Sequence, residues 1–188
     1  MNKPDTPDTP DTPDTPDTPD APDTQHNFEA SRGADPNRES PSPTVGALPD
    51  LAQFFGDDHE KCDRAWADIE NANAEGIDVI KPKWEAFQSM MDRHFRWEEE
   101  TLFPTFERAT GIQHGPTSVM RSEHEQMRAM LRQMASAVAL GDVEALLDQG
   151  DTLHMLVQQH NRKEEGMLYP MAAQVLGGDW ARLHSELA

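Results

Sequence analysis

The chain has 188 residues, with 16 Lys and Arg against 35 Asp and Glu, which gives a formal net charge of −19. Such a strong negative charge repels nucleic acids and anionic membrane surfaces, so we expect neither as a partner. The only cysteine, Cys62, excludes an internal disulfide bond and a thiolate-rich zinc or iron–sulfur site.

The first 46 residues are expected to form no domain. From Pro4 to Thr24 the triplet Pro-Asp-Thr repeats, and proline at every third position prevents both helix and sheet formation. We therefore expect residues 1–46 to be a disordered tail and linker. The tail has no secretory signal pattern, and no stretch of the chain approaches the roughly 18 apolar residues of a membrane span. A cytoplasmic protein is expected.

Two amphipathic helices are expected after the linker. The first spans residues 49–72, with Pro49 in its first turn, and the second runs from near Pro82 to about Glu107. Pro104 is expected to interrupt or kink the last turn of the second helix. Apolar residues recur at every third or fourth position in both, which gives each helix one narrow apolar face.

Two further helices of the same kind are expected after a glycine-containing loop. Thr117 or Ser118 is expected to cap the third helix, which ends at Gly141. The fourth helix spans residues 142–176. Each again has a single apolar face, so the pattern of the first two helices is repeated.

The expected fold class is all-α, an up-down-up-down four-helix bundle. Apolar faces this narrow are buried only by one another, so four such helices joined by modest loops favour this architecture over residues 47–176. Residues 177–188 are expected to form a short C-terminal helix, capped by Asp179, that packs on the bundle.

Polar residues interrupt the apolar faces in a regular way. Each helix carries one inward histidine, and the second and fourth helices carry a glutamate four residues, about one turn, after it. These two helices share the pattern H-x3-E-E-x2-L-[FY]-P, which indicates two related hairpins that meet around one point. The six inward residues are His59, His94, Glu98, His124, His160 and Glu164.

This set of residues indicates a metal site. Two ionised carboxylates buried without partners would each cost several kcal/mol, and metal ions turn them into ligands. Imidazole and carboxylate suit iron, manganese or zinc, and six ligands are too many for one tetrahedral zinc. We therefore predict two metals, each with two terminal histidines and both glutamates bridging. Coordination positions would stay open for oxo, hydroxo, O2, NO or peroxide.

On this motif and the lone histidines of the other two helices, residues 47–176 resemble the hemerythrin/HHE cation-binding family. The resemblance implies a four-helix bundle with a non-haem, carboxylate-bridged centre of two iron ions and the same six ligands. Oxygen-carrying members have a further histidine on the third helix, where this chain has Arg128. Their last carboxylate lies five residues after its histidine. Glu165 has that spacing here and is a lesser candidate beside Glu164.

The ligand set is most similar to the repair-of-iron-centres subgroup, which is associated with nitrosative and oxidative stress. That subgroup carries an N-terminal cysteine-containing domain, whereas this chain has the Pro-Asp-Thr tail. Cys62 is expected to be a small core residue, with a redox role as the alternative. Asp58 and Glu123 directly precede two inward histidines and are expected on a solvated helix face rather than as imidazole partners.

The leading functional hypothesis is a non-haem di-iron protein that binds or senses O2, NO or peroxide, or handles iron under oxidative or nitrosative stress. The first alternative is a di-iron enzyme with peroxidase-, oxidase- or NO-reductase-like activity. The second is a structural or interaction bundle that binds zinc or a single metal. A small diatomic or peroxide ligand is the expected partner at the metals, and the sequence does not identify a protein partner.

Overall fold

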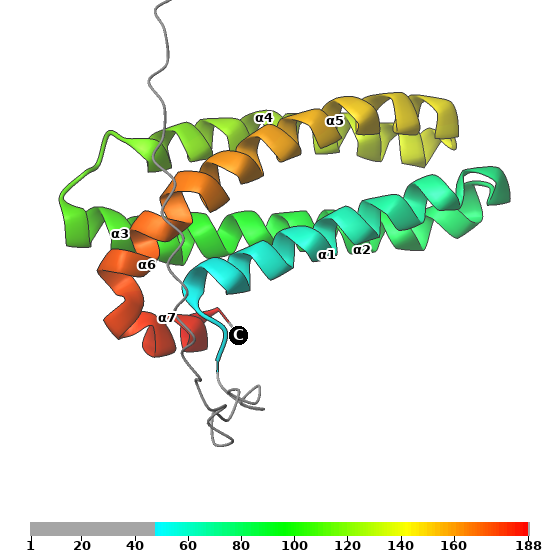
Figure 1. Ribbon diagram of the computed structural model, residues 1–188. Coiled ribbons are helices and arrows are strands. Elements are labelled where there is room, and N and C mark those ends of the chain that lie inside the picture. The colour runs from blue at the N-terminus through cyan, green and yellow to red at the C-terminus, as the bar shows by residue number, and fades with distance from the viewer. Residues whose placement is uncertain (1–47, 188) are drawn as a thin grey trace, which may run out of the picture. The chain divides into compact units, whose positions relative to one another are not determined.

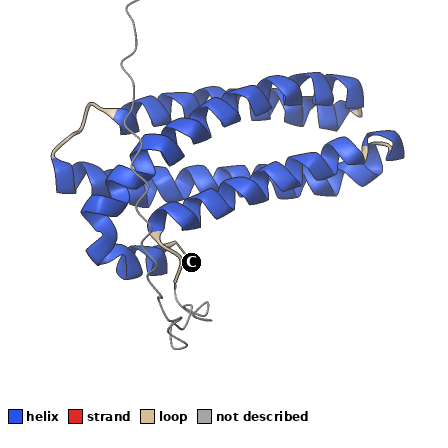
Figure 2. Cartoon of the chain, viewed as in Figure 1, coloured by secondary structure: helices blue, strands red, loops and turns tan. Residues whose placement is uncertain are grey.

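The structure is a computed structural model that describes residues 48–187. All regular structure in this range is helical, which confirms the expected fold class (Figure 2). The expected tail of residues 1–46 lies outside the described range. The four long helices are α1 (Leu51–Asn71), α2 (Ile77–Arg96), α4 (Pro116–Leu140) and α5 (Val143–Lys163).

Helix α1 lies beside α2, and α4 beside α5, so the bundle consists of two helical hairpins (Figure 1). Shorter segments extend the second helix of each hairpin, and the expected short C-terminal helix is present. A 3-10 turn (Asn73–Glu75) connects α1 to α2. The segments that follow α2 are a π-helical turn (Trp97–Leu102) and α3 (Phe103–Thr110). Those that follow α5 are a second π-helical turn (Glu164–Leu168), α6 (Tyr169–Leu176), a 3-10 turn (Gly177–Asp179) and α7 (Trp180–Glu186).

The start of the first hairpin differs from two expectations. Asp50 caps α1 by accepting a hydrogen bond from the Gln53 amide (2.8 Å), so Pro49 precedes the helix instead of occupying its first turn. Helix α2 begins at Ile77, not near Pro82, because buried Ile80 extends the apolar face upstream. Pro82 is exposed within α2.

The expected caps of the second hairpin and of the C-terminal helix were wrong. Helix α4 begins at Pro116, before both expected capping residues. Neither hydroxyl caps the helix, because that of Thr117 donates to Glu107 (2.6 Å) and that of Ser118 donates to a loop carbonyl. Asp179 precedes α7, but its side chain makes no capping bond. Gly141 ends α4 as expected, with a φ of 74° that favours glycine.

Both proline-containing helices widen into a π-helical turn before their proline. The Phe103 amide donates to the Glu98 carbonyl, and the Tyr169 amide donates to the Glu164 carbonyl, five residues back in each case. In a π-helical turn, residues five apart lie one turn apart on the same side. The interruption expected near Pro104 is therefore one extra residue in the helical turn. It brings Phe103 to the same side of the helix as Glu98.

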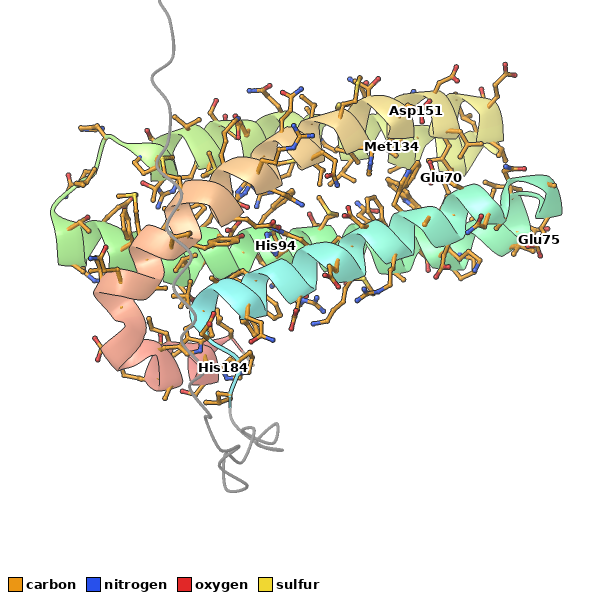
Figure 3. All side chains as sticks on the ribbon, viewed as in Figure 1. Glu70, Glu75, His94, Met134, Asp151 and His184 are labelled. Carbon is orange, nitrogen blue, oxygen red and sulfur yellow. The ribbon has the colours of Figure 1, made fainter. Side chains whose placement is uncertain are left out.

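The apolar core is divided into two clusters. One cluster fills the part of the bundle toward the hairpin turns, with Trp66, Trp84 and Leu131 among its members. The other lies among the start of α1, α3, α6 and α7, with Phe55 and Phe106 among its members. The six inward polar residues belong to neither cluster, and in Figure 3 His94 lies well inside the bundle, far from Glu75 at the α1–α2 turn.

No helix between residues 48 and 187 is long and apolar enough to cross a membrane.

Candidate metal centre

The structure brings the six sequence-predicted residues together. All six are buried, and Glu98 and Glu164 have no exposed surface. Their side chains form two groups whose nitrogen and oxygen atoms lie within 4.8 Å of one another. One group contains His59, His94 and Glu164, and the other contains Glu98, His124, His160 and Glu164.

Each glutamate links an imidazole of one hairpin with an imidazole of the other. Glu164 places Oε2 3.3 Å from Nε2 of His59 and Oε1 3.0 Å from Nε2 of His160. Glu98 places Oε2 3.4 Å from Nε2 of His94 and 3.2 Å from Nε2 of His124. The two carboxylates therefore join the four imidazoles into one cluster across the two hairpins.

The imidazoles face one another in pairs. Nε2 of His59 lies 3.1 Å from Nε2 of His94, and the same distance separates Nε2 of His124 and His160. Each Nδ1 lies against a carboxylate oxygen, which favours the tautomer with the proton on Nδ1. The neutral rings then direct two Nε2 lone pairs at each other, and a shared proton or a metal cation removes that repulsion.

Four carboxylates orient the four rings from outside. Each comes from a helix other than that of the ring it contacts. The Nδ1-to-oxygen distances are 2.7 Å for His59 to Glu165, 3.3 Å for His94 to Asp58, 2.8 Å for His124 to Glu99 and 2.9 Å for His160 to Glu123.

Two expectations about these carboxylates were wrong. Asp58 is 1% exposed and binds both His94 and Arg93, whose Nη2 donates to Oδ1 (2.7 Å). Glu123 contacts His160 and the ammonium group of Lys163. Asp58 is buried and Glu123 is partly buried, and a neighbouring helix presents an imidazole to each.

Glu165 is placed outside the two groups of candidate ligands. Its side chain is 51% exposed and contacts the outer nitrogen of His59. Its counterpart Glu99 contacts His124 and also pairs with Arg128 through two bonds of 2.7 and 2.9 Å. In each Glu-Glu pair of the motif, the first glutamate therefore lies inside the centre. The second contacts the outer nitrogen of an imidazole.

Tyr169 is a further site residue that the sequence reasoning missed. Its hydroxyl lies 2.8 Å from Oε1 of Glu98, 2.9 Å from Oε2 of Glu164 and 3.1 Å from Nε2 of His59. The hydroxyl has a single proton, so it donates a hydrogen bond to one of these three acceptors at a time. The signal was the [FY] position of the motif, where the first hairpin has Phe103 and the second has this tyrosine.

Burial and the negative charge of the glutamates control proton affinity at the centre. Burial disfavours the charged form of His160, yet its contacts with Glu164 and the charge of Glu98 outweigh this and raise its pKa to about 9. The pKa values of His59 and His124 are raised on the same balance. Burial, followed by the charges of Glu164 and Glu98, raises the pKa of Tyr169 well above its usual value.

Two carboxylate oxygens test whether metal ions fit. With the imidazoles protonated on Nδ1 alone, Oε2 of Glu98 and Oε1 of Glu164 are buried and have no hydrogen-bond donor among the described residues. Buried carboxylate oxygens without a partner are costly, and both point at imidazole nitrogens. Oxygen and nitrogen donors of this kind suit iron, manganese or zinc, so the residues present fit a metal pair.

Cys62 lies next to the centre but is not part of it. It is 4% exposed, and burial together with the charge of Asp58 raises its pKa to about 12. A thiol with such a pKa is not a thiolate near neutral pH, so its packing role is favoured over a redox role.

Comparison with known proteins gives one match. The family model described as Hemerythrin HHE cation binding domain matches residues 50–172. Neither the curated proteins nor the solved structures contain a significant match to this chain.

Proposed function

This chain belongs to the hemerythrin HHE cation-binding family, and we propose that its centre holds two iron ions. The observation that carries the proposal is the pair of buried, unpartnered oxygens of Glu98 and Glu164 between four facing imidazole nitrogens. His59 and His94 would hold one ion, His124 and His160 the other, and the two glutamates would bridge them. A di-iron pair supplies reversible binding of small ligands and one-electron chemistry.

The leading function is binding or sensing of O2, NO or peroxide, or handling of iron under stress. The carboxylates around the rings support a binding role, because Asp58, Glu99, Glu123 and Glu165 are all engaged with imidazoles. None of them is left as a free acid or base for turnover. Their effect is to fix each ring's orientation and raise its basicity as a ligand.

Tyr169 favours the enzymatic alternative as a second candidate. Its hydroxyl carries a proton at the centre, in contact with both glutamates. A peroxidase-like reaction needs a proton donor next to the reacting oxygen. Peroxide turnover by the iron-loaded chain that is lost in Tyr169→Phe would support this alternative, and its absence would leave the binding role.

Metal analysis tests the proposal directly. We expect about two irons per chain in protein purified without added metal, with near-ultraviolet oxo-to-iron absorption that changes on exposure to air. Titration with O2, NO and peroxide would then identify the ligand. One zinc per chain, or no metal even after anaerobic iron loading, would contradict the proposal and favour a structural bundle.

A further inference from the structure

The two halves of the centre have different surroundings although their motifs correspond. Asn161 follows His160 as Phe95 follows His94, and Gly56 precedes His59 by three residues as Arg121 precedes His124. At both positions the α1/α5 side of the bundle has the smaller side chain. We therefore compared how each side separates its imidazoles from solvent.

The α2/α4 side is closed. The ring of Phe95 stacks on His124 with 4.2 Å between centroids, and the guanidinium of Arg128 lies over Phe95 (5.0 Å). Arg121 lies over Phe103 (5.2 Å) and pairs with Glu107. A surface groove on this side contains no candidate ligand. Its lining consists of Glu85, Gln88, Ser89, Asp92, Arg96 and Arg128.

The α1/α5 side is open as far as a candidate ligand. A groove of about 350 Å³ between these helices is lined by Gly56, His59, Asn161 and Glu165, among others. Apart from its chain neighbours and the backbone of its own helix, no atom lies within 4 Å of the place where a Cβ of Gly56 would be, so the groove is free at that point. Solvent therefore reaches the edge of His59 from this side.

A small inner cavity lies beyond the groove. Its volume is about 10 Å³, room for roughly one water-sized molecule. Three of the four imidazoles, those of His59, His94 and His160, line it together with apolar side chains such as Met91 and Val157. His59 and Asn161 line both spaces, so Asn161 stands between the groove and the cavity.

We propose that a neutral diatomic molecule of the O2 or NO type reaches the metals through the α1/α5 groove, over Gly56 and past Asn161. The inference rests on the proposed di-iron function. Four acids line the groove, Asp57, Glu60, Asp63 and Glu165, against one arginine, so anions are repelled while neutral molecules are not. The apolar walls of the inner cavity favour the same class of ligand.

The test measures NO association by stopped-flow absorption on the iron-loaded full chain. Gly56→Leu places a side chain in the free part of the groove, in a helix that tolerates it, and should slow association by roughly tenfold or more. Asn161→Phe copies the closed side and should also slow it. Ser89→Leu, in the groove without a candidate ligand, is the matched control and should leave the rate unchanged.

Iron content and melting temperature are measured for every variant, so that loss of the centre is distinguished from a blocked route. Two irons per chain with slow association in Gly56→Leu and an unchanged rate in Ser89→Leu support the route. An unchanged rate in iron-loaded Gly56→Leu overturns it while the proposed function stands, and this holds even if Asn161→Phe fails to fold. A wild-type chain that takes up no iron overturns both.

Discussion

At the scale of single residues, Tyr169 is the most informative side chain of the centre. Its hydroxyl is the one donor in contact with both buried glutamates among residues 48–187. Tyr169→Phe, which copies Phe103 of the other hairpin, removes that donor and leaves the ring in place. We expect the metal-free variant to lose about 1–3 kcal/mol of unfolding free energy, measured by urea denaturation.

The same variant should still bind iron, because none of the six candidate ligands is changed. Iron analysis of the loaded variant provides the control. If the metal-free Tyr169→Phe protein were as stable as the wild type, the hydroxyl would not be compensating the buried carboxylates.

The two inward glutamates should couple metal content to stability. Glu98→Ala or Glu164→Ala removes a carboxylate that both metals would share, and metal binding contributes to folding free energy. We expect fewer than two irons per chain and a lower melting temperature in each variant. Glu60→Ala is the matched control, since this glutamate of α1 is 69% exposed and pairs with Arg64.

Either glutamate variant that kept both metals and the wild-type melting temperature would exclude that residue as a bridging ligand. A change in Glu60→Ala as large as in Glu98→Ala would mean that loss of any carboxylate, not of a ligand, causes the effect.

Cys62 should be unreactive in the native protein. Its thiol is buried and its pKa is raised to about 12, so the thiolate that reacts with disulfide reagents and alkylating agents is scarce. We expect negligible labelling by a chromogenic disulfide reagent at neutral pH under native conditions, and full labelling in denaturant. Fast native labelling would revive the redox role.

The residues at the centre were only partly predictable. The histidines and the inward glutamates could be identified because each interrupts an apolar stripe of its own helix. The contacts of Asp58 and Glu123 could not, because each acid binds an imidazole on a neighbouring helix. Such contacts depend on how two helices are rotated against each other, which the periodicity of one helix does not determine.

At the scale of the elements, the π-helical turns explain why the motif has its spacing. An unbroken α-helix would place residues five apart on different faces, yet Tyr169 contacts Glu164. The extra residue of the Glu164–Leu168 turn brings them together. The prolines predicted an interruption, but they could not specify that it would be a π-helical turn beginning at the glutamate.

Two glycines of the long helices should respond oppositely to the same substitution. A Cβ at Gly150 of α5 would lie 1.9 and 2.1 Å from ring atoms of buried Trp66, whereas nothing lies within 4 Å of one at Gly56 of α1. Gly150→Ala should therefore destabilise the protein by roughly 1–3 kcal/mol through overpacking. Gly56→Ala should stabilise it by about 0.5–1 kcal/mol, because alanine loses less backbone entropy in a helix.

Urea denaturation of the two variants in parallel checks this pair. Equal changes in both would show that helix propensity alone governs these positions and that the close approach of α5 to Trp66 is not maintained.

At the scale of the whole bundle, the centre joins the two hairpins. Each glutamate contacts one imidazole from α1 or α2 and one from α4 or α5. The polar layer also separates the two apolar clusters, so neither cluster alone spans the bundle. The up-down-up-down arrangement could be predicted from four narrow apolar faces. The division of the core could not, because it depends on the six polar residues lying at the same height along the bundle.

Removal of the proposed iron ions should therefore loosen the contact between the hairpins. Without a cation, the facing imidazoles need shared or added protons, and two glutamate oxygens have no other hydrogen-bond donor among residues 48–187. Metal ions that bind only the folded chain stabilise it by mass action. We expect chelation of iron to lower the melting temperature and to increase amide hydrogen exchange first around the centre, in α1 near His59 and in α5 near His160.

Reloading with iron should restore both the melting temperature and the slow exchange, whereas reloading with magnesium should not, because Mg²⁺ prefers oxygen ligands and water. Equal melting temperatures and exchange patterns with and without bound iron would mean that the two apolar clusters hold the hairpins together unaided.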